Sequence, residues 1–454
     1  MILDKTSEVE LIGNEMYEMI EVLYPITRSI TGEGVRKTLK IFQEHIDLEI
    51  HEVKTGIRVF DWVVPEEWNI NDAYIMNKNK EKIVDFKKSN IHVLQYSEKV
   101  NKKIGLEELK EHIFTLPDQP DTIPYRTSFY NKNWGFCMSH NEFLKLNDKE
   151  YSVNISSEHK NGSLTYGEFL IRGESKDEIL ISTYVCHPSL CNDNLSGPVM
   201  SLFLAKYLAK QKLHYSIRFL FIPETIGAIT WLAKNEDKIK NIKHGLVATC
   251  LGDSGNSTYK KSRDGDNIID EIVEEVLIES GKPYKIMDYW PSGSDERQYC
   301  SPGFNLPVGS LMRTPYDMFD EYHTSDDNLS FMNKESLADS FLKYMSVIKK
   351  LEKNFGMQKP MKILKEKKST ENDPVFKNLI PKCEPQLGRR KIYDNVGGMK
   401  KQDSLEQKKA IQWILNLSDG RNSLRDIQNR SGLNYKILLD MAELLVKKQL
   451  LSNV

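Results

Sequence analysis

The sequence predicts an α/β fold in which helices flank a mixed, largely parallel sheet. From Tyr151 to about Phe355, apolar runs of strand length alternate with segments of helical periodicity, as in layered α/β folds. Three of these runs are each followed by a residue that can bind a metal or move a proton, namely His187, Glu224 and Asp253. Ligands of α/β proteins bind at the carboxyl ends of strands, so the sequence places a candidate site at one edge of the sheet.

The length of the chain indicates more than one domain, because 454 residues exceed what a single hydrophobic core usually supports. Changes of pattern along the chain divide it into three parts. We expect an α/β domain formed by residues 1–49 and 146–358, an inserted β-rich domain at 50–145, and a small helical domain at 375–454.

The composition is that of an ordinary soluble protein. With 28% charged residues and a net charge of -2, the chain has no overall attraction to nucleic acid or to anionic membranes. The first ten residues lack the pattern of a secretion signal, and no apolar run is long enough to cross a bilayer. The six cysteines have no paired metal spacing, so we expect reduced, mostly buried thiols and a cytoplasmic protein.

The N-terminal part of the chain predicts two helices joined by a glycine-rich turn. Apolar residues recur at helical spacing from Val9 to Leu23, and the second helix is expected from Val35 to His45. The turn between them contains two glycines and two arginines. A turn of this kind at a helix start can hold a carboxylate, which makes Arg28 a candidate substrate contact. A tight turn capped by Thr31 accounts for the same residues.

The segment from about Ile50 to Leu144 has a β-rich pattern. Short apolar runs at 57–64, 72–76 and 91–96 alternate with polar turns and prolines, which predicts a small β-rich insert. Its many aromatic residues are expected to form the insert's own core, although some could overhang the cleft.

The α/β segment that follows alternates between the two element types. Strands are expected at 179–185, 216–222, 244–251 and about 306–311, and helices at 196–210, 226–234, 268–280 and 335–353.

The end of the chain predicts a linker followed by three helices. Residues 359–401 are rich in lysine and punctuated by prolines and glycines, which is typical of a linker with room for a short hairpin. The helices are expected at 407–417, 423–429 and 434–447, and the short turn between the last two has helix-turn-helix spacing. Because few residues follow Leu450, no conventional wing hairpin is expected after the last helix. Acidic residues offset much of the positive charge, which favours docking on protein over binding DNA.

The candidate site combines residues from distant parts of the sequence. His187 and Asp193 lie in a loop of turn-forming residues directly after the strand at 179–185, Glu224 follows the next strand, and His323 lies in a later acidic loop. Two imidazoles, one or two carboxylate ligands, an open position for water and a carboxylate that takes a proton make up a zinc hydrolase. In such a site Glu224 is the general base.

The order of these residues resembles the zinc aminopeptidase family, whose members have a phosphorylase/hydrolase-like α/β fold and co-catalytic zinc. The resemblance covers roughly residues 1–355 apart from the insert. It rests on Cys186-His187, Asn192-Asp193-Asn194, Pro223-Glu224, Leu251-Gly-Asp253 and Tyr322-His323-Thr324. The segments 28–36 and 292–298 resemble a subgroup of bacterial aminopeptidase-like proteins that end in a winged helix, which implies a winged-helix-like domain at 375–454.

The resemblance implies a role for each site residue. His187, Asp193 and Asp253 would form one zinc site, and Asp193 would bridge to a second site that contains His323. Glu224 would be the base. The expected substrate contacts are Arg28, Asp295 and Tyr322.

The sequence departs from the family pattern at two places. The family usually has two consecutive glutamates, base then ligand, whereas Thr225 follows Glu224 here. The sequence is therefore as compatible with one zinc ion as with two. A single ion would be held by His187, Asp193 and His323, and Asp253 would either bind it or hydrogen-bond to one of its ligands. Pro188 and Ser189 stand where the family commonly has an orienting Asp, and losing such a partner typically costs about 10–100-fold in affinity or activity.

The expected function is that of a zinc-dependent hydrolase cleaving an amide bond in a small peptide or aminoacylated compound. One alternative is a regulator that keeps the peptidase fold without strong activity and uses its C-terminal domain to bind DNA or protein. Another is a deacylase in surface-polysaccharide metabolism, which would use the same water chemistry. We expect no membrane partner. The sequence is compatible with a homo-oligomer.

Overall fold

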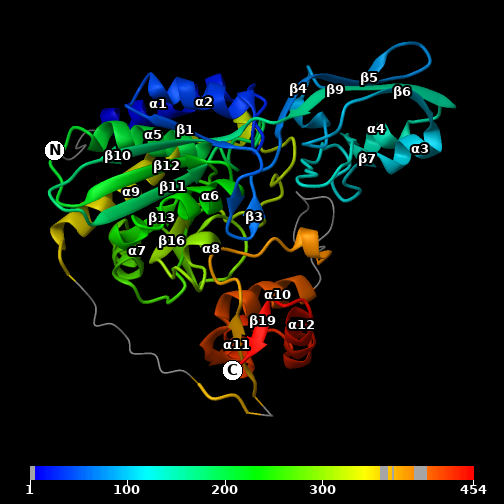
Figure 1. The fold of residues 1–454 in the computed structure, drawn as a ribbon. Helices are drawn as coiled ribbons and strands as arrows, with labels where there is room; N and C mark the ends of the chain where they lie inside the picture. Colours follow the sequence, from blue (N-terminus) through cyan, green and yellow to red (C-terminus); the bar gives the residue numbers. More distant parts are fainter. Residues whose placement is uncertain (1–5, 358–366, 371–372, 393–405) are drawn as a thin grey trace.

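A computed structural model describes residues 6–357, 367–370, 373–392 and 406–454 (Figure 1). Its largest sheet has eight strands in the order β1-β10-β12-β11-β13-β16-β14-β15. These strands are β1 (Glu49–Lys54), β10 (Ser163–Ile171), β11 (Glu178–Tyr184), β12 (Ser216–Ile222), β13 (Ile242–Val247), β14 (Ser257–Lys260), β15 (Tyr284–Met287) and β16 (Val308–Met312). The predicted fold class, a mixed sheet flanked by helices, is confirmed.

The central strands create a switch point for a site. Strands β12, β11, β13 and β16 run parallel, whereas β1, β10 and β14 pair antiparallel with a neighbour. After β11 the chain continues to β12 on one side of it, and from there to β13 on the other side. The connections therefore diverge at the carboxyl end of β11, where α/β sheets place their ligands.

Helices cover both faces of this sheet. The larger core lies under α1 (Thr6–Leu23), α2 (Glu33–Gln43), α5 (Ser196–Leu208), α7 (Ile268–Glu279) and α9 (Lys334–Lys353). The opposite core lies under α6 (Ile226–Lys234) and α8 (Glu296–Tyr299). Along β11, Ile179 and Ile181 belong to the first core and Leu180 to the second. A strand buried on both faces carries apolar residues on both, which explains the uninterrupted apolar run Ile179–Ile181 in the sequence.

The insert forms a four-stranded sheet of its own, in the order β5-β4-β9-β6. Its elements are β2 (Arg58–Val59), β3 (Trp62–Val63), β4 (Glu67–Met76), β5 (Lys82–Asp85), β6 (Val100–Gly105), α3 (Leu106–Glu111), β7 (Ile113–Phe114), β8 (Phe136–Cys137), α4 (His140–Leu144) and β9 (Glu150–Lys160). Strand β1 pairs with the main sheet, and β9, beyond residue 145, pairs within the insert. The segment 91–96 begins as a 3-10 turn, η1 (Asn90–His92), where a strand was expected.

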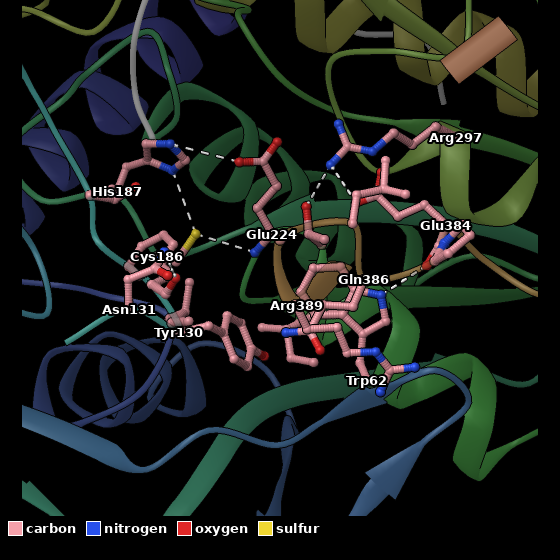
Figure 2. Close-up of a pocket in the computed structure, with 18 of the residues that line it drawn as sticks. Trp62, Tyr130, Asn131, Cys186, His187, Glu224, Arg297, Glu384, Gln386 and Arg389 are labelled. Carbon is pink, nitrogen blue, oxygen red and sulfur yellow. Dashed lines mark hydrogen bonds and ion pairs between the residues drawn. The ribbon is translucent and has the colours of Figure 1, made fainter. Parts of the chain in front are cut away.

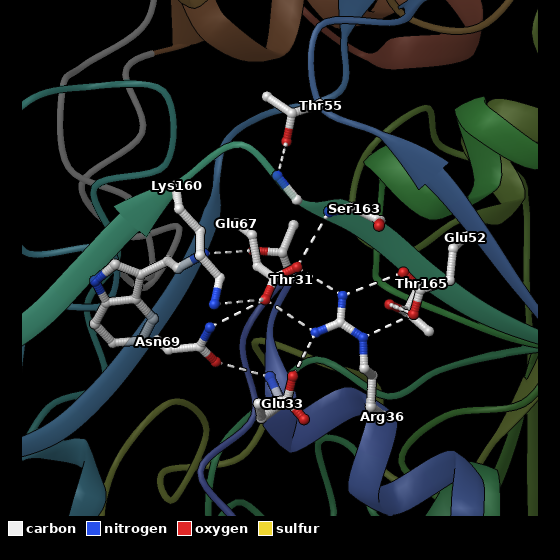
Figure 3. Close-up of polar contacts among 12 residues, drawn as sticks. Thr31, Glu33, Arg36, Glu52, Thr55, Glu67, Asn69, Lys160, Ser163 and Thr165 are labelled. Carbon is white, nitrogen blue, oxygen red and sulfur yellow. Dashed lines mark hydrogen bonds and ion pairs between the residues drawn. The ribbon is translucent and has the colours of Figure 1, made fainter.

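A partly buried ion-pair network joins the insert to the main domain (Figure 3). Arg36 of α2 contacts Glu52 of β1 at 2.7 Å and Glu67 of β4 at 2.6 Å. The Glu67 side chain is 3% exposed, and its carboxylate also accepts a hydrogen bond from the Ser163 backbone N–H. Because these residues come from both sheets, the network fixes the insert against α2 and the main sheet.

The C-terminal part is a winged-helix unit. It contains β17 (Val375–Asn378), α10 (Glu406–Leu417), β18 (Asp419–Ser423), α11 (Leu424–Ser431), α12 (Tyr435–Lys447) and β19 (Leu451–Asn453). The three strands form one sheet in which β17 lies between β18 and β19. The last residues therefore pair with a strand that precedes all three helices, and the predicted linker at 359–401 contains that strand. The rest of that predicted linker lies partly outside the described residues.

Within the described residues, no helix is both long enough and apolar enough to span a lipid bilayer.

Candidate active site

The loop after β11 carries His187 and Asp193 and is shaped by Asp327. The two Asp327 carboxylate oxygens accept the backbone N–H groups of Asn192, at 2.6 Å, and of Asp193, at 2.8 Å. The Asp327 carbonyl accepts the N–H of Cys191. Burial raises the pKa of Asp327 to about 8, although the backbone donors oppose this rise. Asp327 thus ties the later acidic loop to the loop that presents Asp193.

His187, Asp193 and His323 converge on one small volume. Their potential ligand atoms all lie within 4.8 Å of one another. Asp193 Oδ2 lies 3.0 Å from His323 Nε2 and 4.0 Å from His187 Nε2. The other carboxylate oxygen of Asp193 accepts a hydrogen bond from the Tyr184 hydroxyl. Two imidazole nitrogens and a carboxylate oxygen are a ligand set that zinc takes in proteins, so these residues fit the ion.

Aromatic rings hold the two histidines in place. Tyr125 of the insert lies against both, with ring centroids 5.3 Å from His187 and 5.1 Å from His323. Tyr322 stacks on His323 at 3.9 Å. Burial lowers the pKa of His187 to about 4, so its imidazole is neutral and can act as a ligand near neutral pH. Burial alone would raise the pKa of Asp193, but the two histidines and Tyr184 bring it below its ordinary value.

Glu224 lies beside this group at the carboxyl end of β12. Its Oε2 is 3.8 Å from His187 Nε2, and its backbone N–H donates to Cys186 Sγ (Figure 2). Burial raises the pKa of Glu224 well above its ordinary value, and the carboxylates of Asp295 and Asp193 raise it further. A carboxylate with a raised pKa next to a metal site is suited to take up and return a proton.

The residue after Glu224 is clamped in an unfavourable backbone conformation. Thr225 has φ 62° and ψ -75°, a region that a β-branched residue rarely adopts. Asp295 Oδ1 accepts its N–H at 2.7 Å, and Arg297 Nη2 donates to its hydroxyl at 2.8 Å. Burial raises the pKa of Asp295 to about 7. Asp295 and Arg297 therefore fix the turn that presents Glu224.

The other predicted site residues lie outside the metal-ligand group. Asp253 accepts hydrogen bonds from Gly255, from the Asn192 amide and from the Thr314 hydroxyl and N–H, so it supports the loop without joining the three ligands. Arg28 is 1% exposed and donates to the carbonyl oxygen of His187 at 2.8 Å, behind the histidine. Arg28, Asp295 and Tyr322 are absent from the described lining of the pocket.

A pocket of about 510 Å3 opens in front of Glu224, His187 and His323 (Figure 2). Insert residues form one wall, including Trp62, Phe129 and Tyr130. Another wall comes from the segment Pro381–Arg390, which we call the strap. Glu384, Pro385, Gln386, Leu387, Gly388 and Arg389 of the strap all line the pocket.

The strap was missed in the sequence because its pattern is that of a linker. Asp327 was likewise not singled out, although it belongs to the acidic loop that contains His323. The available signal was that Asp327 is one of several carboxylates close to His323 in this loop. No comparable signal marks Glu384.

The fold and the site together define an aminopeptidase-like α/β protein with a C-terminal winged helix. Comparison with solved structures supports this class. A zinc aminopeptidase from Bacillus subtilis covers 74% of this chain and 94% of its own, with 11% identity and a TM-score of 0.54. An M28 peptidase precursor from Shewanella amazonensis covers 78% and 98%, with 14% identity and a TM-score of 0.52. At these identities the likeness concerns the fold alone.

The chain belongs to the family described as "Domain of unknown function (DUF4910)", which matches residues 17–354, and a winged helix-turn-helix family matches residues 374–453. A Clostridium acetobutylicum protein, named "Putative polysaccharide biosynthesis protein with aminopeptidase-like domain", is 53% identical over 442 residues, 97% of each chain. A crystal structure from the same organism, titled as a putative peptidase, is 51% identical with a TM-score of 0.75 and covers 99% of this chain and 98% of its own.

Proposed function

We propose that this protein is a zinc-dependent hydrolase of the aminopeptidase type that cleaves an amide bond in a small peptide or aminoacylated compound. The observation that carries the proposal is the group of three donor atoms from His187, Asp193 and His323, within 4.8 Å of one another, with Glu224 at its side. The fold shared with zinc aminopeptidases supports the same chemistry.

The residues present favour one ion. His187, Asp193 and His323 would hold it. The Thr225 hydroxyl, at the position where the family commonly has a second glutamate, is engaged by Arg297, and Asp253 is engaged by backbone and side-chain donors. Zinc bound here would polarise the substrate carbonyl and lower the pKa of water toward about 7.

Glu224 performs the proton transfers in this proposal. Its carboxylate takes a proton from the water whose oxygen attacks the carbonyl carbon. It then delivers that proton to the nitrogen as the carbon–nitrogen bond breaks, so that an acid and an amine leave. The neighbouring carboxylates, which raise the pKa of Glu224, favour its retaining the proton between these two steps.

Metal analysis combined with a panel of amino-acid amides tests the proposal. We expect about one zinc per chain and turnover of at least one amide. Glu224→Gln should keep the zinc and lose at least about 100-fold in kcat, the range typical of an acid–base residue. Glu279→Gln, on the exposed side of α7, is the matched control and should behave as the native chain. Full turnover in Glu224→Gln would refute the mechanism.

A second candidate is removal of an acyl group from an amino sugar by the same residues. It is favoured by the description of the 53% identical relative as a polysaccharide biosynthesis protein. The aromatic wall formed by Trp62, Phe129 and Tyr130 is also compatible with stacking on a sugar ring. Adding N-acetylated amino sugars to the panel separates the candidates, because a deacylase should release acetate and leave free amino-acid amides intact.

A further inference from the structure

The strap is anchored in the hydrophobic core of the winged-helix unit. Leu387 lines the pocket in front of Glu224, and it also belongs to the apolar core formed by α10, α11 and α12. Just before the strap, the Asn378 side-chain amide at the end of β17 donates to the Leu415 carbonyl of α10 at 2.7 Å. One wall of the pocket is therefore built on the winged-helix unit.

The strap also reaches the turn that presents Glu224, which we call the catalytic turn. The Trp62 indole N–H of the insert donates to the Glu384 carbonyl at 2.8 Å. Arg297 Nη2 lies 3.1 Å from Glu384 Oε1 and 2.8 Å from the Thr225 hydroxyl (Figure 2). Because Thr225 follows Glu224 directly, a displacement of the strap is passed through Arg297 to the catalytic turn.

The winged-helix unit docks on the main domain through contacts outside the pocket. Arg263 of the main domain donates to the Asn416 carbonyl at 3.1 Å and to the Asp419 carboxylate at 2.8 Å. The Asn416 amide donates to the Tyr289 hydroxyl at 2.9 Å. None of these four residues is among the described residues that line the pocket. An interface that relies on such polar contacts allows the two units to move relative to each other, whereas a large apolar interface does not.

A small cavity separates the strap from α10. Its volume is about 30 Å3, and it is lined by Leu387 of the strap, by Gln412 and Leu415 of α10 and by Arg297 of the main domain. Arg297 thus borders both this cavity and the pocket. The strap has room to shift when α10 moves, and the arginine that holds the catalytic turn lies beside it.

We propose that docking of the winged-helix unit regulates the hydrolase site, because the docked unit holds the strap in the pocket wall and undocking displaces it. This regulation rests on the proposed hydrolase function and specifies how that site is controlled. Coupling between two sites is reciprocal, so a substrate that fills the pocket also favours the docked unit.

Hydrogen exchange in the full, ligand-free chain tests the link between docking and pocket without any turnover. Arg263→Gln and Asp419→Asn remove the charged docking contact from its two sides. N–H groups of the strap donate to the main domain and to the insert, and we expect residues 381–390 to exchange at least about tenfold faster in both variants. Lys436→Gln, on an exposed side of α12, is the matched control and should exchange like the native chain. A cooperative unfolding transition checks that each variant is folded.

Turnover of an amide measures the effect on the site. In both docking variants we expect KM to rise at least about fivefold, the lower end of typical coupling between sites. Since substrate restores docking, kcat at saturating substrate should stay within about twofold of the native value. Lys436→Gln should change neither constant.

Each outcome has a distinct meaning. Unchanged exchange of the strap in both docking variants overturns the coupling, whatever their turnover. Faster exchange with native KM and kcat in an active chain also overturns it, as does a kcat that stays low at saturating substrate. If strap exchange depends on docking but the native chain hydrolyses no amide, the hydrolase function is refuted and the coupling of docking to the pocket wall stands.

Discussion

Asp327 shows how one buried carboxylate can determine the geometry of a candidate metal site without binding the metal. Both of its oxygens accept backbone N–H groups of the loop that carries Asp193. In Asp327→Asn, the amide NH2 would face one of these donors, so the loop should shift. We expect zinc affinity to fall by about 10–100-fold, as for other residues that orient metal ligands. Competition with a chelator measures this change.

The neighbouring Asp326→Asn is the control for that prediction. Asp326 is exposed and accepts no backbone N–H from the Asp193 loop, so its replacement should leave zinc affinity unchanged. Equal losses in the two variants would mean that the charge of the acidic loop matters, and not the hydrogen bonds of Asp327.

The ion pair between Arg36 and Glu67 gives a prediction for stability and its dependence on pH (Figure 3). The hydrogen bond from Arg36 lowers the pKa of Glu67 from 4.5 to about 2. The stabilisation that the ionised Glu67 gains from Arg36 is therefore complete above about pH 4.5, and it is lost as the pH falls towards 2. We expect Glu67→Gln to lower the free energy of unfolding by about 1.5–3 kcal/mol near pH 7. The difference from the native chain should shrink below pH 4.5.

Glu33→Gln is the matched control, because Glu33 contacts the same Arg36 at 2.7 Å but is 70% exposed. Exposed pairs contribute little, so this change should cost less than about 0.5 kcal/mol. Denaturant unfolding at several pH values measures both variants. If the difference in unfolding free energy between Glu67→Gln and the native chain stays constant down to pH 3, the lowered pKa of Glu67 is contradicted.

The residue types of the candidate site could be predicted, whereas the direction of individual side chains could not. His187, Asp193 and His323 were expected to meet, and the structure brings their ligand atoms together. Arg28 was interpreted as a substrate contact, but it points behind His187 to a carbonyl oxygen. Arg28 also donates to the carbonyl oxygen of Leu23 at the end of α1, so its direction depends on where α1 ends relative to the loop after β11, which no local pattern of residues encodes.

At the scale of elements, local periodicity predicted the strands β11, β12, β13 and β16 and the long helices of the main domain, but it missed the outer strands β1, β10, β14 and β15. Long-range pairing determined what it missed. Helix α9 at 334–353 lies within one residue of its expected start. The strap, in contrast, is fixed by partners far away in sequence. The Gln386 N–H donates to Asp61, 325 residues earlier, and no window of sequence around a lysine-rich segment contains that information.

Asp61 therefore gives a prediction about the strap. It is buried and accepts hydrogen bonds from Gln386, Arg389 and Arg390. In Asp61→Asn, both arginines lose their charged partner, so the pocket wall should loosen. We expect KM for an amide substrate to rise about tenfold, the equivalent of about 1.4 kcal/mol, with zinc content and kcat little changed.

Lys382→Gln is the control for this change, since Lys382 contacts Glu236 at an exposed pair at the other end of the strap. Its KM should match that of the native chain. A fall in kcat alone for Asp61→Asn would indicate that the strap acts on the catalytic turn and not on substrate binding.

At the scale of the whole molecule, the winged-helix unit is docked on the main domain through polar contacts. Arg263, which is 5% exposed, donates to the carbonyl of Asn416 and to the Asp419 carboxylate, and Asn416 donates to the Tyr289 hydroxyl. Arg430 donates to the Arg263 carbonyl. The interface uses charged groups of both units, which favours an intramolecular role for this unit.

These contacts predict weak binding to DNA. Three basic residues of this unit are engaged within the chain: Arg430 and Lys448 contact backbone carbonyls of Arg263 and Arg390, and Lys436 pairs with Asp440. We expect the full chain to bind random duplexes at 150 mM salt no more tightly than about 10⁻⁶ M, the range of non-specific binding. Fluorescence anisotropy at two salt concentrations measures this affinity, and Lys436→Ala, which removes an 82% exposed lysine, should change it little. A duplex selected from a random pool and bound at about 10⁻⁸ M would instead assign the winged helix to DNA recognition, because such affinity requires base contacts beyond charge.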